Sequence, residues 1–346
     1  MERAKNLKIK LNKVQGELRN KARISECFHH KKEECQGEIK NAHSIQRNGR
    51  LSVIEGNVNG NQCLYSFTET ELNPSTQKLE LKPIGKAKAS TFFGFCDYHD
   101  STLFSPIENY MFDNSDKHCF LHSYRAFAHT QHKKIEQLKA FTSDAEFNEY
   151  QKFELAARIE GTKIGIADGE RVRRRLEQIL DDEAYDELDY FTMVYDQLFP
   201  VACSASFTPK FSPKSNRMLN YHPNVNAPFQ LVFLTVLPDF EQTIIIMGCL
   251  PEHEKSVLFI DEFASLSSYQ QNKMLTSILI GIVENTFIAP ALYEALGKEG
   301  KNQLLKELEE TSMFALTIYK SLYKSKLNFF QSRFSAKSLG IKNNCS

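Results

Sequence analysis

Hydrophobic positions change their spacing along the chain, and the changes predict different elements in different parts. In residues 104–196 apolar side chains such as Phe120, Tyr124 and Phe127 recur at helical spacing, which predicts a run of helices. The C-terminal part adds four strand-like runs bounded by Pro or Gly and then two helices: PVACSASFT, FQLVFLTVLP, QTIIIMGCL and KSVLFID, then residues from about 267 to 296 and from about 301 to 325. The segment LPDFEQT predicts a hairpin between two of these strands.

The N-terminal part has a different pattern. Residues 1–22 show partial helical periodicity, whereas residues 23–103 are short, turn-rich pieces that rarely hold a large hydrophobic core. A bound metal is one way to stabilise such a stretch. We therefore predict an α+β protein with a mainly antiparallel C-terminal sheet and three consecutive parts. The parts are a basic helix with a metal-binding unit (residues 1–110), a helical region (111–199) and an α+β domain that senses a ligand or binds a partner (200–346).

Charge and hydropathy narrow the class of protein. The chain of 346 residues has zero formal net charge, but residues 1–50 hold thirteen Lys or Arg and six Glu, a local charge of +7. The positive charge of this segment is favourable for binding the phosphate backbone of a nucleic acid, and a solvated basic helix explains the charge equally well. The start lacks the apolar core of a signal peptide. Glu284 and Asn285 interrupt the most apolar stretch, 274–292, which predicts a buried helix rather than a membrane span. We expect a cytoplasmic protein with no membrane contact.

Several enzyme classes lack their sequence patterns here. The chain contains no G-x-x-x-x-G-K-[ST], no G-x-S-x-G and no G-x-G-x-x-G. These patterns supply a phosphate-cradling loop, a nucleophile elbow and a dinucleotide-binding turn. Their absence argues against an ATPase, a serine hydrolase and a dinucleotide-dependent enzyme.

Cysteine and histidine positions indicate a zinc site. Eight cysteines in a cytoplasmic chain of this length argue against a disulfide framework. Cys27 with Cys35, and Cys96 with His99, form two spaced pairs of sulfur and imidazole ligands, which suit tetrahedral zinc. Seven residues separate Cys27 from Cys35, more than in a usual zinc knuckle, whereas Cys27-x-x-His30 has knuckle spacing. The fourth ligand therefore stays open between Cys35 and His30.

The order of two segments, EIKNAHSI and then FCDYHD, resembles the HNH nuclease family. The resemblance covers residues 24–110 and implies a ββα-metal hairpin and helix, stapled by zinc in a treble-clef arrangement. It implies that His43 is the general base, that Asp100 takes the place of the last metal-binding histidine, and that Thr91 lies near the place of the middle asparagine. The sequence departs from the family at Asp100, at Thr91 and at Ala42, where the family often has a metal ligand.

The resemblance implies a metal-dependent nuclease that cleaves phosphodiesters in DNA or RNA. A histidine with a near-neutral pKa can deprotonate the attacking water. A divalent ion can neutralise charge on the phosphate and the leaving oxygen, and the Asp100 carboxylate suits Mg or Mn. We expect the phosphates to be bound by Lys40, Arg47 and Arg50. A small nuclease joined to a sensing domain is similar to the layout of prokaryotic defence and restriction effectors.

Two other functions fit the sequence. A non-enzymatic module would use zinc as a scaffold and its basic residues to bind nucleic acid or a protein, including a second copy of the chain. Arg125-x6-His132 also resembles the short Arg/His motif of HEPN ribonucleases, in which two copies meet across a dimer. Four residues share one predicted helical face, which either forms a metal or phosphate site or is packed or solvated: His118, His122, Arg125 and His129.

Overall fold

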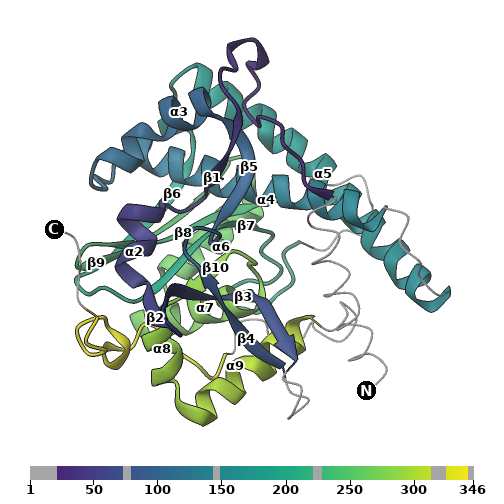
Figure 1. The fold of residues 1–346 in the computed structure, drawn as a ribbon. Coiled ribbons are helices and arrows are strands. Elements are labelled where there is room, and N and C mark those ends of the chain that lie inside the picture. Colours follow the sequence, from purple (N-terminus) through teal and green to yellow (C-terminus); the bar gives the residue numbers. More distant parts are fainter. Residues whose placement is uncertain (1–21, 73–78, 143–148, 221–227, 313–324, 342–346) are drawn as a thin grey trace. The chain divides into compact units, whose positions relative to one another are not determined.

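The computed structural model describes residues 22–72, 79–142, 149–220, 228–312 and 325–341 (Figure 1). The chain forms two compact units, and each unit is assembled from three separated stretches. Unit 1 holds the residues up to Ala42, Phe92–Phe104 and Ala128–Ala184, and unit 2 holds His43–Thr91, Ser105–Phe127 and Tyr185 onward. This division differs from the three consecutive parts predicted from the sequence, because residues 43–91 contribute strands to the sheet of unit 2.

A short two-stranded sheet leads into the first long helix. β1 (Ile39–His43) pairs with β5 (Thr91–Cys96), and α3 (Asp97–Asn109) follows β5 without a loop. Two backbone hydrogen bonds show that the strands run antiparallel: Ser44 N–H to Ser90 O at 2.9 Å and Asp97 N–H to Glu38 O at 3.1 Å. The order of these elements is therefore strand, strand, helix.

Unit 1 has an aromatic core. The ring of Phe95 makes edge-to-face contacts with three other Phe rings: Phe28 (6.1 Å between centroids), Phe92 (5.8 Å) and Phe104 (5.1 Å). Such contacts are favourable beyond the area that they bury. They join the strand β5 to the segment before β1 and to the first half of α3.

The two longest helices of the described part are α4 (Asp116–Phe141) and α5 (Glu149–Asp181), and α5 packs closely against residues 128–141 of α4 within unit 1. A Cβ atom at Gly169 would overlap the amide group of Gln131, so a larger residue at this position requires the Gln131 side chain to move. The buried Gln131 side chain donates to Ile166 O at 2.9 Å. A glycine on α5 therefore lets the amide of Gln131 reach the backbone of α5.

Unit 2 is built on an antiparallel sheet, which has eight strands among the described residues, in the order β2-β3-β10-β7-β8-β9-β6 with β4 beside β3. Its strands are β2 (Gly56–Val58), β3 (Asn61–Leu72), β4 (Leu79–Gly85), β6 (Asp189–Tyr195), β7 (Val201–Phe207), β8 (Val232–Asp239), β9 (Gln242–Cys249) and β10 (Thr286–Ile288). Its helices are α2 (Ser52–Ile54), α6 (Glu254–Ala264), α7 (Ser268–Gly281), α8 (Pro290–Ala295) and α9 (Gly297–Ser312). Every residue of β7 and β8 is buried, which explains why apolar and small side chains predominate at successive positions of both strands.

The α+β class and the antiparallel sheet are confirmed, as are three of the predicted strands and the hairpin between β8 and β9. Three expectations were wrong. KSVLFID belongs to the helix α6, residues 189–195 form the strand β6 rather than helix, and the helix predicted over 267–296 is broken by β10. The helix predicted over residues 1–22 and the end of the last predicted helix fall outside the described residues. Within the described part, no helix has the length and apolar character needed to cross a bilayer.

Candidate functional site

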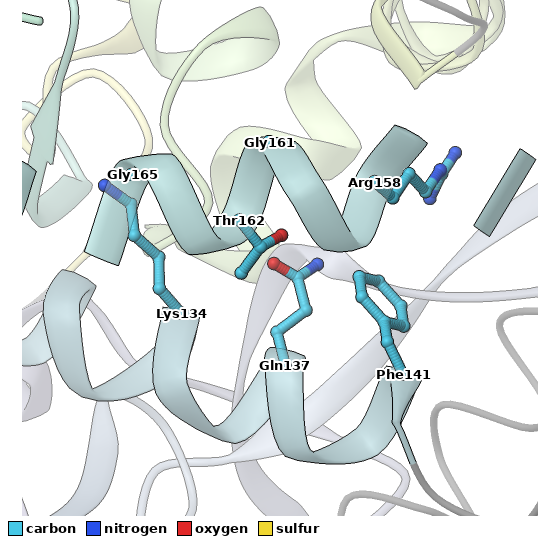
Figure 2. Close-up of a pocket in the computed structure, with 7 residues that line it drawn as sticks. All are labelled: Lys134, Gln137, Phe141, Arg158, Gly161, Thr162 and Gly165. Carbon is cyan, nitrogen blue, oxygen red and sulfur yellow. The ribbon is translucent and has the colours of Figure 1, made fainter. Parts of the chain in front are cut away.

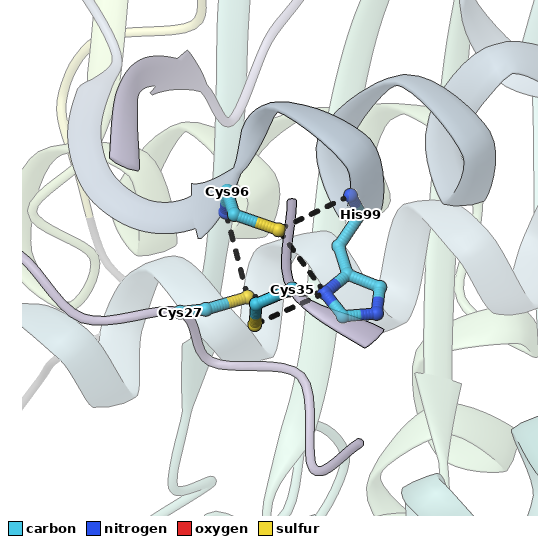
Figure 3. A group of neighbouring side chains, drawn as sticks. All are labelled: Cys27, Cys35, Cys96 and His99. Carbon is cyan, nitrogen blue, oxygen red and sulfur yellow. Dashed lines mark hydrogen bonds between the residues drawn. The ribbon is translucent and has the colours of Figure 1, made fainter. Parts of the chain in front are cut away.

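Three cysteines and one histidine converge in unit 1 (Figure 3). Cys27 and Cys35 come from the segment before β1, Cys96 ends β5, and His99 lies in the first turn of α3. The ligand atoms of all four side chains lie within 4.8 Å of one another. Cys27, Cys96 and His99 are buried, and Cys35 is partly exposed. The four side chains could hold a metal ion.

The distances favour a shared metal over hydrogen bonding. Nδ1 of His99 lies 3.4 Å from Sγ of Cys27, 3.7 Å from Sγ of Cys35 and 3.2 Å from Sγ of Cys96. A neutral ring nitrogen has one lone pair and cannot accept from three thiols at once. With Zn–S bonds of about 2.3 Å and a Zn–N bond of about 2.0 Å, tetrahedral geometry gives S···N distances of roughly 3.5 Å. The tetrad therefore has the size and donor set of a Cys₃His zinc centre.

Backbone N–H groups point at the sulfur atoms. The N–H of Cys96 donates to Sγ of Cys27 and the N–H of His99 donates to Sγ of Cys96, each at 3.4 Å. Burial raises the pKa of Cys27, and burial together with the neighbouring thiols raises the pKa of Cys35 to about 12. Burial also opposes ionisation of Cys96, but N–H donation outweighs it and lowers that pKa. Placing several thiolates close together is unfavourable because their charges repel. A bound cation would offset this repulsion and favour the deprotonated thiolates, which are the form that binds metal.

Other side chains fix the position of His99. The ring of His29 stacks on it at 3.9 Å between centroids, and burial, with His99 beside it, lowers the pKa of His29 to about 3. The carboxylate of Glu34 lies near the second ring nitrogen, with its Oε2 3.8 Å from Nε2 of His99. A carboxylate near Nε2 favours the tautomer that carries its hydrogen there and leaves the lone pair on Nδ1, beside the three sulfur atoms.

Of the two candidates for the fourth ligand, Cys35 lies in the cluster with Cys27, Cys96 and His99. His30 lies outside the tetrad and pairs with the end of α5, its Nε2 2.8 Å from Oδ2 of Asp181. Lys31 pairs with the same carboxylate at 2.7 Å. These ion pairs anchor the Cys27–Cys35 segment to α5, and no second group of three or more metal-ligating side chains occurs within the described residues.

His43, the predicted base, is the last residue of β1 and belongs to unit 2. Its Nδ1 lies 3.1 Å from Ala89 O. Because a carbonyl oxygen only accepts, Nδ1 carries the hydrogen and the neutral ring keeps its lone pair on Nε2. Burial is the main cause that lowers the pKa of His43, and the charges of Arg47 and Arg125 act in the same direction, while Glu108 and the Ala89 carbonyl oppose them.

The three predicted phosphate ligands have different surroundings. Arg47 is exposed. Arg50 is buried, 4% exposed, and its guanidinium pairs with the buried carboxylate of Asp239 at the end of β8. A buried and paired guanidinium is already neutralised, so this pairing weighs against contact between Arg50 and a phosphate. The side chain of Lys40 lies outside the described residues.

The other two predicted catalytic residues lie at the ends of β5. Thr91 begins the strand and donates from Oγ1 to Lys88 O at 2.9 Å. Asp100 is half-buried in the first turn of α3 and belongs to unit 1. The structure thus brings together four residues that were predicted to bind zinc, whereas His43 and Asp100 belong to different units.

The helical face with several histidines is largely packed. His118 pairs with Asp113 at 3.1 Å, and Arg125 pairs with Glu108 at 2.5 Å. His132 donates from Nε2 to Phe93 O at 3.1 Å. Burial lowers the pKa of His122 and His129 well below the usual histidine range. Each of the two residues in the HEPN-like hypothesis, Arg125 and His132, therefore has a partner within the protein.

A groove of about 300 Å³ lies between α4 and α5 in unit 1 (Figure 2). Lys134 and Arg158 supply positive charge at its lining. Figure 2 shows the side chains of Gln137 and Thr162 directed toward each other across the groove. The remaining lining residues are Phe141, Gly161 and Gly165.

Comparison with protein-family models gave no match, and neither did comparison with curated proteins or with solved structures. Function is therefore inferred from the residues themselves. Sequence reasoning missed Glu34, Glu108 and Asp239, which pair with His99, Arg125 and Arg50 respectively. Nothing in their spacing marks them, because each partner comes from another element.

Proposed function

We propose that the chain is a zinc-stabilised, HNH-like nuclease that cleaves nucleic-acid phosphodiesters with His43 as its general base. One observation carries the proposal: β1 ends at His43, and its partner β5 leads through Cys96 into a helix that carries His99. The strand, strand, helix order around a Cys₃His tetrad is the arrangement that the family resemblance implies. The zinc ion would be structural, because four protein ligands complete its tetrahedral shell.

The hydrogen bonding of His43 supports a role as a base. The Ala89 carbonyl oxygen accepts from Nδ1, so the lone pair of a neutral ring lies on Nε2. Burial lowers the pKa of His43, with the effect that the ring is neutral at pH 7 and able to take a proton from water. Ser90 holds the same strand end, since its Oγ donates to Ile45 O at 3.1 Å.

A divalent cation would supply charge neutralisation at the phosphate and the leaving oxygen. Its binding by Asp100 as Mg or Mn stays a prediction. Arg47, exposed on the turn after β1, is the residue best placed to attract a phosphate to the His43 segment.

Strand cleavage tests the proposal. Labelled DNA and RNA are incubated with the full chain and Mg or Mn, and initial rates are compared with those of variants. His43→Ala should lower the rate by about 10²–10⁴-fold, the usual contribution of a general base. His253→Asn is the matched control, because its amide oxygen can still accept from the Leu231 N–H as His253 does. Equal rates for the wild type and His43→Ala would refute the assignment.

A non-enzymatic nucleic-acid-binding module is the second candidate, and the groove between α4 and α5 favours it. Lys134 and Arg158 both line this groove, and two positive side chains suit a sugar-phosphate backbone. This function predicts binding that weakens steeply with salt and no cleavage by any preparation. Replacing both Lys134 and Arg158 by Gln should then flatten the dependence of log Kd on log salt concentration.

A further inference from the structure

The segment after His43 is tied by a hydrogen bond to a partly buried ion pair in unit 2. Nε2 of Gln46 donates to the backbone O of Glu108 at 2.8 Å, and the carboxylate of Glu108 accepts from the Arg125 guanidinium at 2.5 Å. A Cβ atom at Gly49 would lie 2.3 Å from Oε1 of Gln46, so glycine leaves room for the side chain that makes the first of these bonds.

We propose that the Glu108–Arg125 ion pair is a positioning unit for His43, which holds the segment after the strand and places one negative and one positive charge beside the imidazole. The inference rests on the proposed role of His43 as a base. Neither Glu108 nor Arg125 needs to touch the substrate. Both act through the histidine.

The exposure of the two partners supports this arrangement. Arg125 is 3% exposed and comes from the buried face of α4, so its charge is held at a fixed place. The Glu108 side chain is 28% exposed, which leaves one edge of the pair near water. A charge-assisted hydrogen bond of this kind fixes geometry as well as charge.

The charges that face His43 come from three elements. Arg47 lies on the turn after β1, Glu108 on α3 and Arg125 on α4, and the Ala89 carbonyl oxygen accepts from the ring itself. The two arginines disfavour the imidazolium form and Glu108 favours it. Removing one member of the pair should therefore shift the titration of His43 in a direction that identifies the member removed.

The test is an NMR titration of the histidine ring signals in the full chain, with the His43 signal assigned from its loss in His43→Asn. Glu108→Gln keeps the shape of the side chain and an acceptor for Arg125, and it should lower the pKa of His43, because a charge that favours the imidazolium form is removed. Arg125→Gln should raise it. Asp113→Asn removes a carboxylate of unit 2 that faces His118 instead, and it should leave His43 unchanged.

The variants also separate this inference from the nuclease proposal. If the chain cleaves nucleic acid, the acidic limb of its pH–rate profile should shift in Glu108→Gln in the same direction as the pKa of His43 measured by NMR. If no preparation cleaves nucleic acid, the nuclease proposal fails, and the NMR titration still decides whether the pair controls His43. If Arg125→Gln does not fold, Glu108→Gln decides. An unchanged His43 titration in Glu108→Gln would overturn the inference.

Discussion

At the scale of single residues, Cys96 connects the most features of the metal centre. Its Sγ lies 3.2 Å from Nδ1 of His99, its N–H donates to Cys27, and its sulfur accepts from the next turn of the chain. The spacing of Cys96 and His99 on a strand-to-helix junction makes both side chains point to one side, which local sequence alone can predict. The long Cys27–Cys35 loop was harder to assign, because His30 had the more usual spacing.

Cys96→Ser should lower bound zinc well below one ion per chain, because a hydroxyl is a much weaker zinc ligand than a thiolate. The measurement is elemental analysis of protein purified without added metal. Cys203→Ala is the control, since Cys203 is a buried thiol in β7 and lies outside the tetrad. Equal zinc content in the two variants would contradict the ligand assignment.

The buried histidines predict a loss of stability in acid. Burial lowers the pKa of His122 in the folded chain, so the unfolded chain binds more protons once the pH falls below the ordinary histidine value of about 6.5. The stabilisation is thus complete above that value and is lost as the pH falls, by about 1.4 kcal/mol per pH unit for one such group. His122→Asn should have a smaller drop in urea midpoint between pH 7.5 and 5.5 than the wild type. Equal drops would show that His122 does not contribute.

At the scale of elements, α5 combines close packing and open surface along one helix. Gly169 meets Gln131 of α4, whereas a Cβ atom at Gly161 would have no heavy atom within 4 Å. Glycine is unfavourable inside a helix, but at Gly169 it leaves room for the buried amide of Gln131.

Two matched substitutions on α5 should have opposite effects. Gly161→Ala should stabilise the protein by about 0.5–1 kcal/mol, since alanine has the higher helix propensity and meets nothing. Gly169→Ala should destabilise it by roughly 1–3 kcal/mol, because Gln131 must move from a buried hydrogen bond. Urea unfolding measures both. A stabilising Gly169→Ala would show that α4 and α5 are not in contact at this point.

Elements with strong local patterns were predicted from the sequence, and ambiguous ones were not. β7, β8 and β9 are continuous apolar runs of strand length, and a short turn joins the last two. KSVLFID looked like another strand, but Ser256, Phe259, Ile260 and Phe263 of α6 are buried at helical spacing, a pattern visible only in a longer window. β6 was missed because its acidic flanks continue the charge pattern of the preceding helix.

At the scale of the whole molecule, the division into units depends on contacts that no local pattern reveals. β3 lies beside β10, with Ser66 opposite Phe287, so strands from the two ends of the chain share one sheet. For this reason residues 43–91 were predicted to belong with the metal site and instead build unit 2. The Cys/His cluster could be predicted from residue type and spacing. The pairing of β3 with β10 could not, because pairing over such sequence distance is set by tertiary packing.

Removal of the metal should affect one unit specifically. After treatment with a zinc chelator, amide hydrogen exchange should rise in peptides from residues 27–35 and 92–100, because the cross-link between these segments is lost. Peptides from β7 and β8 should keep their protection, since their strands are buried in the sheet of unit 2. Exchange that rises equally everywhere, or nowhere, would contradict a local structural role for the metal.

The measurement that tests the metal centre most directly is X-ray absorption at the zinc edge of the purified protein. Cys27, Cys35, Cys96 and His99 predict three sulfur atoms at about 2.3 Å and one nitrogen at about 2.0 Å. A first shell of oxygen and nitrogen alone, or folded protein that binds no zinc, would contradict the Cys₃His centre and with it the zinc-stabilised unit on which the nuclease proposal depends.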